Sequence, residues 1–156
     1  MDYRRAPSNP PLIVTLRERV MALDPDSSAL RWEQRFPGGA GRLFLVGATL
    51  VVTGKTTSSA RCFDLESGAL RGHFDLGLVV ETGLVRGDRL FLASSDAVVC
   101  ITVGGSLIWG AWMENGALVF RNQAGDELWR MGAEAMNGLA TSPLLLLGDL
   151  AAQPGS

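Results

Sequence analysis

The sequence is short of positive charge, and it lacks both a long hydrophobic run and a leader segment. Fourteen Lys and Arg stand against sixteen Asp and Glu, so no basic surface is expected to follow a nucleic acid backbone. No apolar run approaches the roughly 18 residues of a membrane-spanning helix. Residues 1–11 carry two arginines without an apolar segment behind them, unlike a signal peptide. From these absences we expect a cytoplasmic protein that binds neither nucleic acid nor membranes.

Histidine and cysteine are too scarce to build the common reactive sites. His73 is the only histidine, and it has no Cys or carboxylate at metal-ligand spacing. The serine-rich turns at residues 57–59 and 94–96 are not expected to hold a nucleophile, because no second histidine is available for a triad. Cys62 and Cys100 occupy matching places in two apolar strands, so we expect two buried thiols. A disulfide is the alternative, although it suits a reducing cytoplasm poorly.

The acidic and glycine-rich turns also lack the patterns of ion-binding sites. Asp24, Asp26, Asp64 and Glu66 lie two to a turn, without the dense series of oxygen ligands that a calcium loop needs. The glycine-rich residues 38–41 are followed by neither a lysine nor a predicted helix, as a phosphate loop would be. We therefore expect no catalytic residue, no metal site and no cofactor.

Glycine and short apolar runs are what the sequence has in quantity. Nineteen glycines among 156 residues fall mostly between apolar segments, in a chain that is 47 % hydrophobic and 19 % charged. This composition is typical of one folded domain made of short strands and tight turns. The only candidate for a helical turn is at residues 134–138. We expect a flexible N-terminal tail over residues 1–10, a repeat domain over 11–148 and a C-terminal tail over 149–156.

One thirteen-residue unit recurs along the chain. The sequence VMALDPDSSALRW at residues 20–32 returns as ARCFDLESGALRG at residues 60–72. Asp24 then matches Asp64, an offset of 64 − 24 = 40 residues, and Ser28 matches Gly68. Looser copies stand at residues 98–110 and 118–130. Each copy predicts a strand, a polar or glycine-rich turn, and a second strand.

The strands group around these units in a regular order. Three groups are expected to be followed by half a group and a lone strand. The predicted strands are residues 11–16, 20–23 and 30–36; 42–46, 49–53, 60–63 and 69–76; 78–85, 89–93, 97–103 and 106–113; then 117–121 and 127–131; and finally 141–148.

Groups of four short antiparallel strands at intervals of about 40 residues are typical of propeller blades. The segments Ala22-Leu-Asp24…Ala29-Leu-Arg-Trp32 and Cys62-Phe-Asp64…Ser67-Gly68-Ala-Leu70 resemble the repeat of the PQQ-like (quinoprotein-like) β-propellers. The resemblance covers residues 11–131. It implies an all-β fold of antiparallel four-stranded blades, about three and a half of them in this chain.

The copies depart from the family repeat at single positions. Ser28 stands in the glycine place of the first copy, Gly72 in the tryptophan place of the second, and Thr102 and Asn122 in the aspartate places of the others. In such a repeat the aspartate accepts backbone N–H groups, the glycine adopts the left-handed conformation, and the tryptophan packs between blades, burying on the order of 200 Å². The structural repeat positions are Asp24, Trp32, Asp64, Gly68, Gly105, Trp109, Gly125 and Trp129.

The family's cofactor does not carry over with the repeat. The quinoprotein dehydrogenases hold calcium and a quinone with Glu, Asn and Asp side chains and use an aspartate base. None of those positions can be matched in this sequence, which is also too short for an eight-bladed ring. We expect no quinone.

Three and a half blades cannot close a ring, because a closed propeller needs at least about four. An isolated arc would leave two unpaired sheet edges. The first group lacks its first strand, which residues 143–147 would supply from the same chain or another. We expect a homo-oligomer, or a protein partner that completes the ring, with two chains making about seven blades.

The sequence favours a non-catalytic protein-interaction or scaffold module over an enzyme, because strand repeats come without clustered reactive residues. The alternative is a ligand-binding or enzymatic propeller with its site in the central channel. Residues near the inner strands, Arg42, Glu81 and Thr82, would line that channel.

Overall fold

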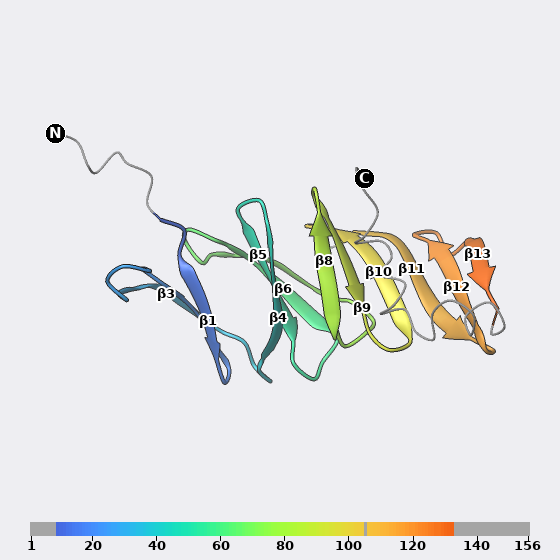
Figure 1. The fold of residues 1–156 in the computed structure, drawn as a ribbon, viewed down its shortest axis with the longest axis horizontal. Helices are drawn as coiled ribbons and strands as arrows, with labels where there is room; N and C mark the ends of the chain where they lie inside the picture. Colours follow the sequence, from blue (N-terminus) through green and yellow to red (C-terminus); the bar gives the residue numbers. More distant parts are fainter. Residues whose placement is uncertain (1–8, 105, 133–156) are drawn as a thin grey trace.

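The computed structural model describes residues 9–104 and 106–132, and within them every regular element is a β-strand. The thirteen strands form three antiparallel sheets of three, four and six strands. Figure 1 shows the sheets following one another along the long axis of the molecule. The predicted all-β fold of propeller type, with antiparallel sheets that do not close into a ring, is confirmed.

Strand order within each sheet follows the sequence, so every neighbouring pair is a hairpin. The first sheet is β1-β2-β3, the second is β4-β5-β6-β7, and the third runs from β8 to β13. The bounds are β1 Leu12–Leu16, β2 Arg19–Leu23, β3 Leu30–Arg35, β4 Ala40–Val46, β5 Thr49–Gly54, β6 Ser59–Asp64, β7 Leu70–Asp75, β8 Thr82–Arg86, β9 Arg89–Ala93, β10 Ala97–Thr102, β11 Leu107–Glu114, β12 Ala117–Asn122 and β13 Glu127–Met131.

The third sheet differs from the expected four strands and a separate half group. β11 is eight residues long and pairs with β10 along one edge and with β12 along the other. The turn between β11 and β12 is Asn115-Gly116, with φ of 51° and 80°, the left-handed pair that joins adjacent strands of one hairpin. The fourth copy of the repeat therefore extends the third sheet sideways and does not begin a fourth blade.

The hydrophobic core lies between the sheets. Val20, Ala22 and Trp32 of the first sheet pack against Leu50 and Phe63 of the second. A second cluster joins the other face of the second sheet to the third sheet. A third cluster, including Val98, Ala111 and Phe120, lies on the face of the third sheet that points away from the second. The second and third sheets thus have buried residues on both faces, as stacked repeats do.

Some sequence predictions fall outside the described residues. These are the helical turn at residues 134–138, the last strand at residues 141–148, Gly105, most of the N-terminal tail at residues 1–10 and the C-terminal tail at residues 149–156. No helix long and apolar enough to cross a membrane occurs in the described part of the chain.

Candidate functional site

The first signature turn is held by the carboxylate of Asp24. Its Oδ1 accepts the backbone N–H groups of Asp26 at 2.9 Å and Ser27 at 3.0 Å, and its Oδ2 accepts from Nη2 of Arg31 at 3.0 Å. The hydrogen bond from Arg31, followed by those from the two backbone amides, lowers the pKa of Asp24 to about 2. The carboxylate is therefore fully engaged in closing the turn.

The second turn repeats this arrangement forty residues later. Asp64 accepts the backbone N–H and the hydroxyl of Ser67, both at 2.9 Å, and pairs with Arg71. Its pKa is lowered, first by the backbone amide of Ser67 and then by the Ser67 hydroxyl and Arg71. The glycine place is left-handed in both turns, with φ of 75° at Gly68 and 61° at Ser28.

The later copies replace the aspartate but keep an acceptor. In the third turn the hydroxyl of Thr102 accepts the backbone N–H of Ser106 at 3.2 Å. In the fourth, Oδ1 of Asn122 accepts the backbone N–H of Asp126 at 2.9 Å, and Gly125 has a φ of 89°. All four turns are thus closed by a side-chain oxygen at the same place.

The three repeat tryptophans have unlike surroundings. Trp32 is 8 % exposed and reaches the second sheet, where its Nε1 donates to the carbonyl of Leu65 at 2.8 Å. Trp109 is half-buried between Phe91 and Phe120 on the third sheet. Trp129 stacks on Phe120 with ring centroids 3.9 Å apart, yet it is 47 % exposed. Packing between sheets is therefore seen at Trp32, whereas Trp129 differs from the expected burial.

The face of the first sheet that points away from the second sheet has no covering element among the described residues. Ile13, Val20, Ala22 and Trp32 face the second sheet, so the alternating residues of the same strands point outward. We call this outward side the front face; its members are Leu12, Val14 and Leu16 on β1, Arg19, Met21 and Leu23 on β2, and the charged Arg31, Glu33 and Arg35 on β3.

The repeat allows each front-face residue to be compared with the residue at the same position in the second and third sheets. Leu12 pairs with Leu23, just before the first signature turn, as Leu50 pairs with Phe63 and Leu90 with Ile101. Leu50 and Leu90 are 3 % and 0 % exposed because a preceding sheet covers them, whereas Leu12 is 53 % exposed.

The same comparison holds for Val14, the next residue of β1 on the front face. Val14 corresponds to Val52 and Leu92, which are fully buried, but Val14 is only partly buried. Leu30, although 54 % exposed, matches Leu70 at 49 %, so its exposure is ordinary for its place. The front face therefore keeps apolar residues at positions that are covered in the other two sheets.

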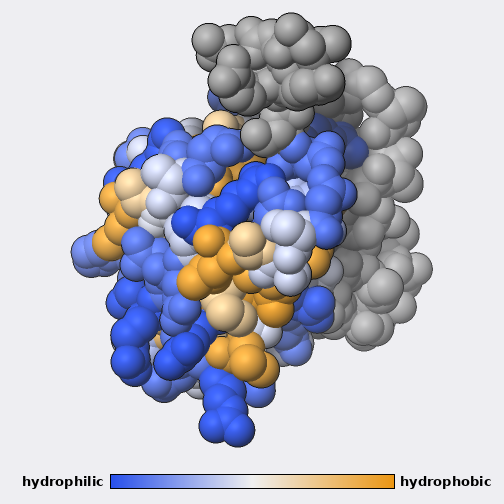
Figure 2. Space-filling view, turned by 90° about the vertical axis from the view of Figure 1, so that its left-hand side faces the viewer, coloured by the Kyte–Doolittle hydropathy of each residue, from blue (hydrophilic) through white to orange (hydrophobic). Residues whose placement is uncertain are grey.

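Figure 2 views the molecule from this side and shows an apolar band crossing a largely hydrophilic surface. At the turn between β1 and β2 the surface is hollowed, and this hollow of about 570 Å³ is lined by Leu16, Arg17, Glu18, Arg19 and Arg35. Ion pairs neutralise part of this charge: Arg19 lies 3.3 Å from Glu33, and Arg35 lies 3.7 Å from Glu18. Within the described chain, Arg17 has no such partner.

Within residues 9–104 and 106–132, no strand pairs with the outer edge of β1, which we call its free edge. β4 and β8 occupy the first-strand position of their sheets, whereas β1 corresponds to the second strand of each. β1 is the sequence LIVTL, with no charge, proline or bulge inside it. In natural proteins a charge, a proline or a bulge normally prevents an edge strand from pairing with another chain. Because β1 has none of these, its outer edge is suited to pair with a further strand.

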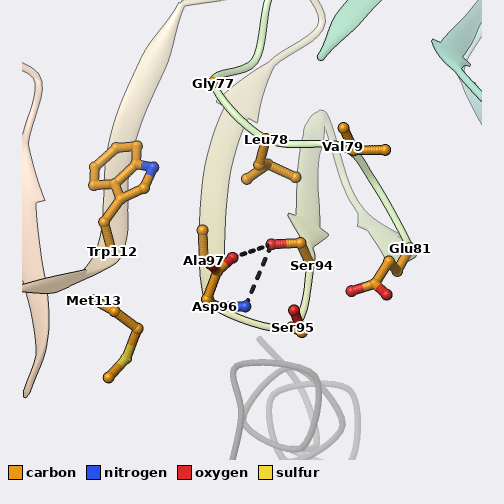
Figure 3. Close-up of a pocket in the computed structure, with 10 residues that line it drawn as sticks. All are labelled: Gly77, Leu78, Val79, Glu81, Ser94, Ser95, Asp96, Ala97, Trp112 and Met113. Carbon is orange, nitrogen blue, oxygen red and sulfur yellow. Dashed lines mark hydrogen bonds between the residues drawn. The ribbon is translucent and has the colours of Figure 1, made fainter. Parts of the chain in front are cut away.

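A second hollow, of about 460 Å³, lies between the segment before β8 and the β9–β10 turn. Figure 3 shows Leu78 and Ala97 in its middle, the indole of Trp112 on one side and the carboxylate of Glu81 on the other. The hydroxyl of Ser94 donates to Oδ1 of Asp96 at 3.0 Å. Neither Glu81 nor Asp96 has an ion-pair partner among the described residues.

The residues predicted to line a channel are only partly brought together. Glu81 lines the hollow of Figure 3, but Arg42 and Thr82 do not. Arg42 lies on β4, where its backbone amide donates to the hydroxyl of Thr53 at 2.9 Å. The hollow itself was not predicted. Its apolar residues lie in strands and linkers, and the hydrophobic pattern of the sequence predicts them to be in the core.

His73, Cys62 and Cys100 line neither the hollow at the β1–β2 turn nor the hollow of Figure 3. His73 is exposed on β7. Cys62 and Cys100 are buried free thiols, and burial raises the pKa of both. No group of three or more His, Cys, Asp or Glu that could hold a metal ion occurs over residues 9–104 and 106–132.

Comparisons with known proteins identify the fold. No protein-family model matches the chain, and no curated protein does either. The crystal structure of BamB from Moraxella catarrhalis matches with a TM-score of 0.54 and 12 % identity, over 76 % of this chain and 48 % of that one. A europium-containing methanol dehydrogenase matches with a TM-score of 0.57 and 14 % identity, over 69 % of this chain and 24 % of that one.

Kluyveromyces lactis Hsv2 matches with a TM-score of 0.50 and 14 % identity, over 74 % of this chain and 39 % of that one. At these identities the likeness extends to the propeller fold alone. The chain spans less than half the length of each of these three structures.

Proposed function

We propose that this chain is a non-catalytic protein-interaction module, and that its binding surface is the front face of the first sheet. The observation that carries the proposal is the exposure of Leu12 at 53 %, against 3 % and 0 % for the corresponding Leu50 and Leu90. When a partner covers an exposed apolar side chain, the removal of that surface from water stabilises the complex.

The chemistry of the partner follows from what covers the corresponding positions inside the chain. Against Leu50 and Val52 the first sheet presents Val20, Ala22 and Trp32, which are apolar residues on alternate positions of strands. The partner that fits the front face is therefore a protein offering the apolar face of a β-sheet. Such a partner also extends the arc of sheets toward a ring.

A photo-crosslinking residue in place of Met21, at the middle of the front face, tests this in cells. The matched control carries the same residue in place of Leu70, which is exposed on β7. We expect one protein, identified by mass spectrometry, to be captured at position 21 and not at position 70, and the added change Leu23→Asp to abolish the capture. Equal capture at both positions, or none at position 21, contradicts the proposal.

A second candidate function is the binding of a small cationic ligand in the hollow of Figure 3. The supporting observation is that Glu81 and Asp96 lack ion-pair partners within the described chain while Trp112 offers an aromatic face, since cations bind to carboxylates and to indole rings. A thermal-shift screen of matched aliphatic amines and acids tests it. A shift of several degrees with amines alone, lost in Glu81→Gln, is the expected result.

A further inference from the structure

We propose that two copies of this chain pair through β1, edge to edge and antiparallel about a twofold axis, to form one six-stranded sheet, β3-β2-β1-β1-β2-β3. This inference deepens the proposed interaction function by naming a second copy as the occupant of the free edge. It leaves the front face available for the partner described above.

The backbone of β1 presents hydrogen-bonding groups at its free edge. β1 and β2 are joined by the two-residue turn Arg17-Glu18, and Leu16 pairs with Arg19 beside it. The pair next to such a turn is hydrogen-bonded, and hydrogen-bonded pairs alternate along the ladder. The amides and carbonyls of Leu16, Val14 and Leu12 therefore point to β2, while those of Ile13 and Thr15 point outward.

This spacing is self-complementary. If the twofold axis passes beside Val14, Ile13 of one copy faces Thr15 of the other, and the two residues exchange two hydrogen bonds. The symmetry generates the same pair again, so four hydrogen bonds form from two residues in each chain. Val14 then faces Val14 of the second copy in the closely spaced pair between them.

The side chains match in the same register. Leu12 of one copy faces Leu16 of the other on the front side, and both are more than half exposed in the single chain, at 53 % and 59 %. Cross-strand pairs of branched apolar residues stabilise antiparallel sheets. The front faces of the two copies also join into one continuous apolar surface.

Charge supports this orientation as well. In the antiparallel arrangement the turn with Arg17 lies at the end of the sheet where β2 of the second copy runs into its first signature turn. That turn carries Asp26, whose Oδ2 accepts only the amide of Asn9 at 2.9 Å. Over the described residues neither Arg17 nor Asp26 has an ion-pair partner. Two strand spacings separate β1 of one copy from β2 of the other, on the order of 10 Å, within reach of a long arginine side chain.

An isologous contact of this kind closes by itself. Because the same edge is used on both copies, a dimer leaves no further β1 edge to recruit a third chain. It also removes the unprotected edge that would otherwise promote aggregation.

Disulfide crosslinking of the full chain tests both the dimer and its register. The closely spaced pair brings the two Val14 Cα atoms to about 4.5 Å, within the range that a disulfide spans. Val14→Cys is therefore expected to form a covalent dimer under mild oxidation. Leu12→Cys and Leu16→Cys are the matched controls, because each faces the other position and lies about 13 Å from its own symmetry copy.

Sedimentation equilibrium of the unmodified chain, with Thr15→Pro as a second variant, gives the oligomeric state. Proline at an outward-facing position of an edge strand removes one donor from the free edge only, so at least a tenfold weaker dimer is expected, with an unchanged far-UV spectrum. A monomer at all concentrations overturns the proposal, and so does a dimer in which Val14→Cys does not crosslink. If the chain is monomeric but Met21 still captures another protein, the dimer fails and the interaction module stands.

Discussion

The indole of Trp32 lies so close to Gly68 that a Cβ atom on Gly68 would come within 2.4 Å of its Cδ2. The two residues belong to neighbouring sheets, and Gln34 on the same strand donates to the carbonyl of Gly68 at 2.7 Å. The tryptophan of one repeat therefore packs directly against the glycine of the next signature turn.

Gly68→Ala should destabilise the protein strongly. The substitution meets both the indole and a φ of 75°, so we expect a loss of roughly 2–5 kcal/mol in the free energy of unfolding. Gly125→Ala is the control: its φ is 89° but no atom lies within 4 Å of the added Cβ, so only the backbone cost of about 1–2 kcal/mol applies. Urea unfolding measures both, and equal losses would show that the contact with Trp32 is not strained.

Ser28→Gly should stabilise the protein by roughly 0.5–1 kcal/mol. Ser28 holds the left-handed conformation, at a φ of 61°, in the place that Gly68 fills in the next repeat. Ser27→Gly is the control and should destabilise, because the Ser27 hydroxyl accepts the amide of Ala29 at 3.2 Å. Thermal unfolding followed by circular dichroism distinguishes the two; a lower midpoint for Ser28→Gly would contradict the prediction.

The tryptophans should differ sharply in their contribution to stability. Trp32→Ala removes a buried ring and its hydrogen bond to Leu65, and a loss of about 3–5 kcal/mol is expected. Trp129→Ala removes a ring that is 47 % exposed and stacked on Phe120, and should cost roughly 1–2 kcal/mol. The ordering, measured by urea unfolding at one pH, is the test; the reverse ordering would contradict it.

Stability should fall as the pH drops from about 4 to about 2. The pKa of Asp24 is lowered from 3.8 to about 2 in the folded chain, so the folded state binds the proton less readily than the unfolded state. Its contribution is complete above the unfolded pKa and is lost as the pH falls through the folded value. The urea midpoint followed against pH measures this. Asp24→Asn should flatten the profile in that range, and an unchanged slope would assign the acid sensitivity to other carboxyls.

Cys62 and Cys100 should react with thiol reagents only after unfolding. Both are buried, burial raises the pKa of each thiol, and the Cys62 thiol donates to the carbonyl of Val103 at 3.4 Å. The thiolate is the reactive form. Labelling at pH 8 with and without urea is the measurement, and fast modification of the folded chain would show that the sheets separate readily.

The strands were predictable because their signals are local. Alternating and short apolar runs place β2, β5 and β9 within one residue of the predicted bounds, and Asp24 and Asp64 mark turns through hydrogen bonds to residues two and three positions on. Local preference and final structure agree at these places, so one sequence window is enough.

Pairing beyond the hairpin was harder to predict. The turn Asn115-Gly116 is itself a hairpin signal, but a repeat period of about 40 residues suggested a new unit at the same place. The structure follows the turn, because β11 has a free edge for β12 to join. The front face was not foreseen either, since Leu12 and Leu50 look alike as residues and differ only in what lies beside them.

Strands that pair only with their neighbours in sequence also determine how the chain reaches this structure. Every strand pairing in the three sheets closes a connection between consecutive strands, so no distant segments must meet before a sheet can grow. Loop-closure entropy is small for such contacts, and folding rates rise as contacting residues lie closer in sequence. The hairpins should therefore form first, one after another along the chain. The stacking of whole sheets, which includes the contact between Trp32 and Gly68, should be the slower and more cooperative step.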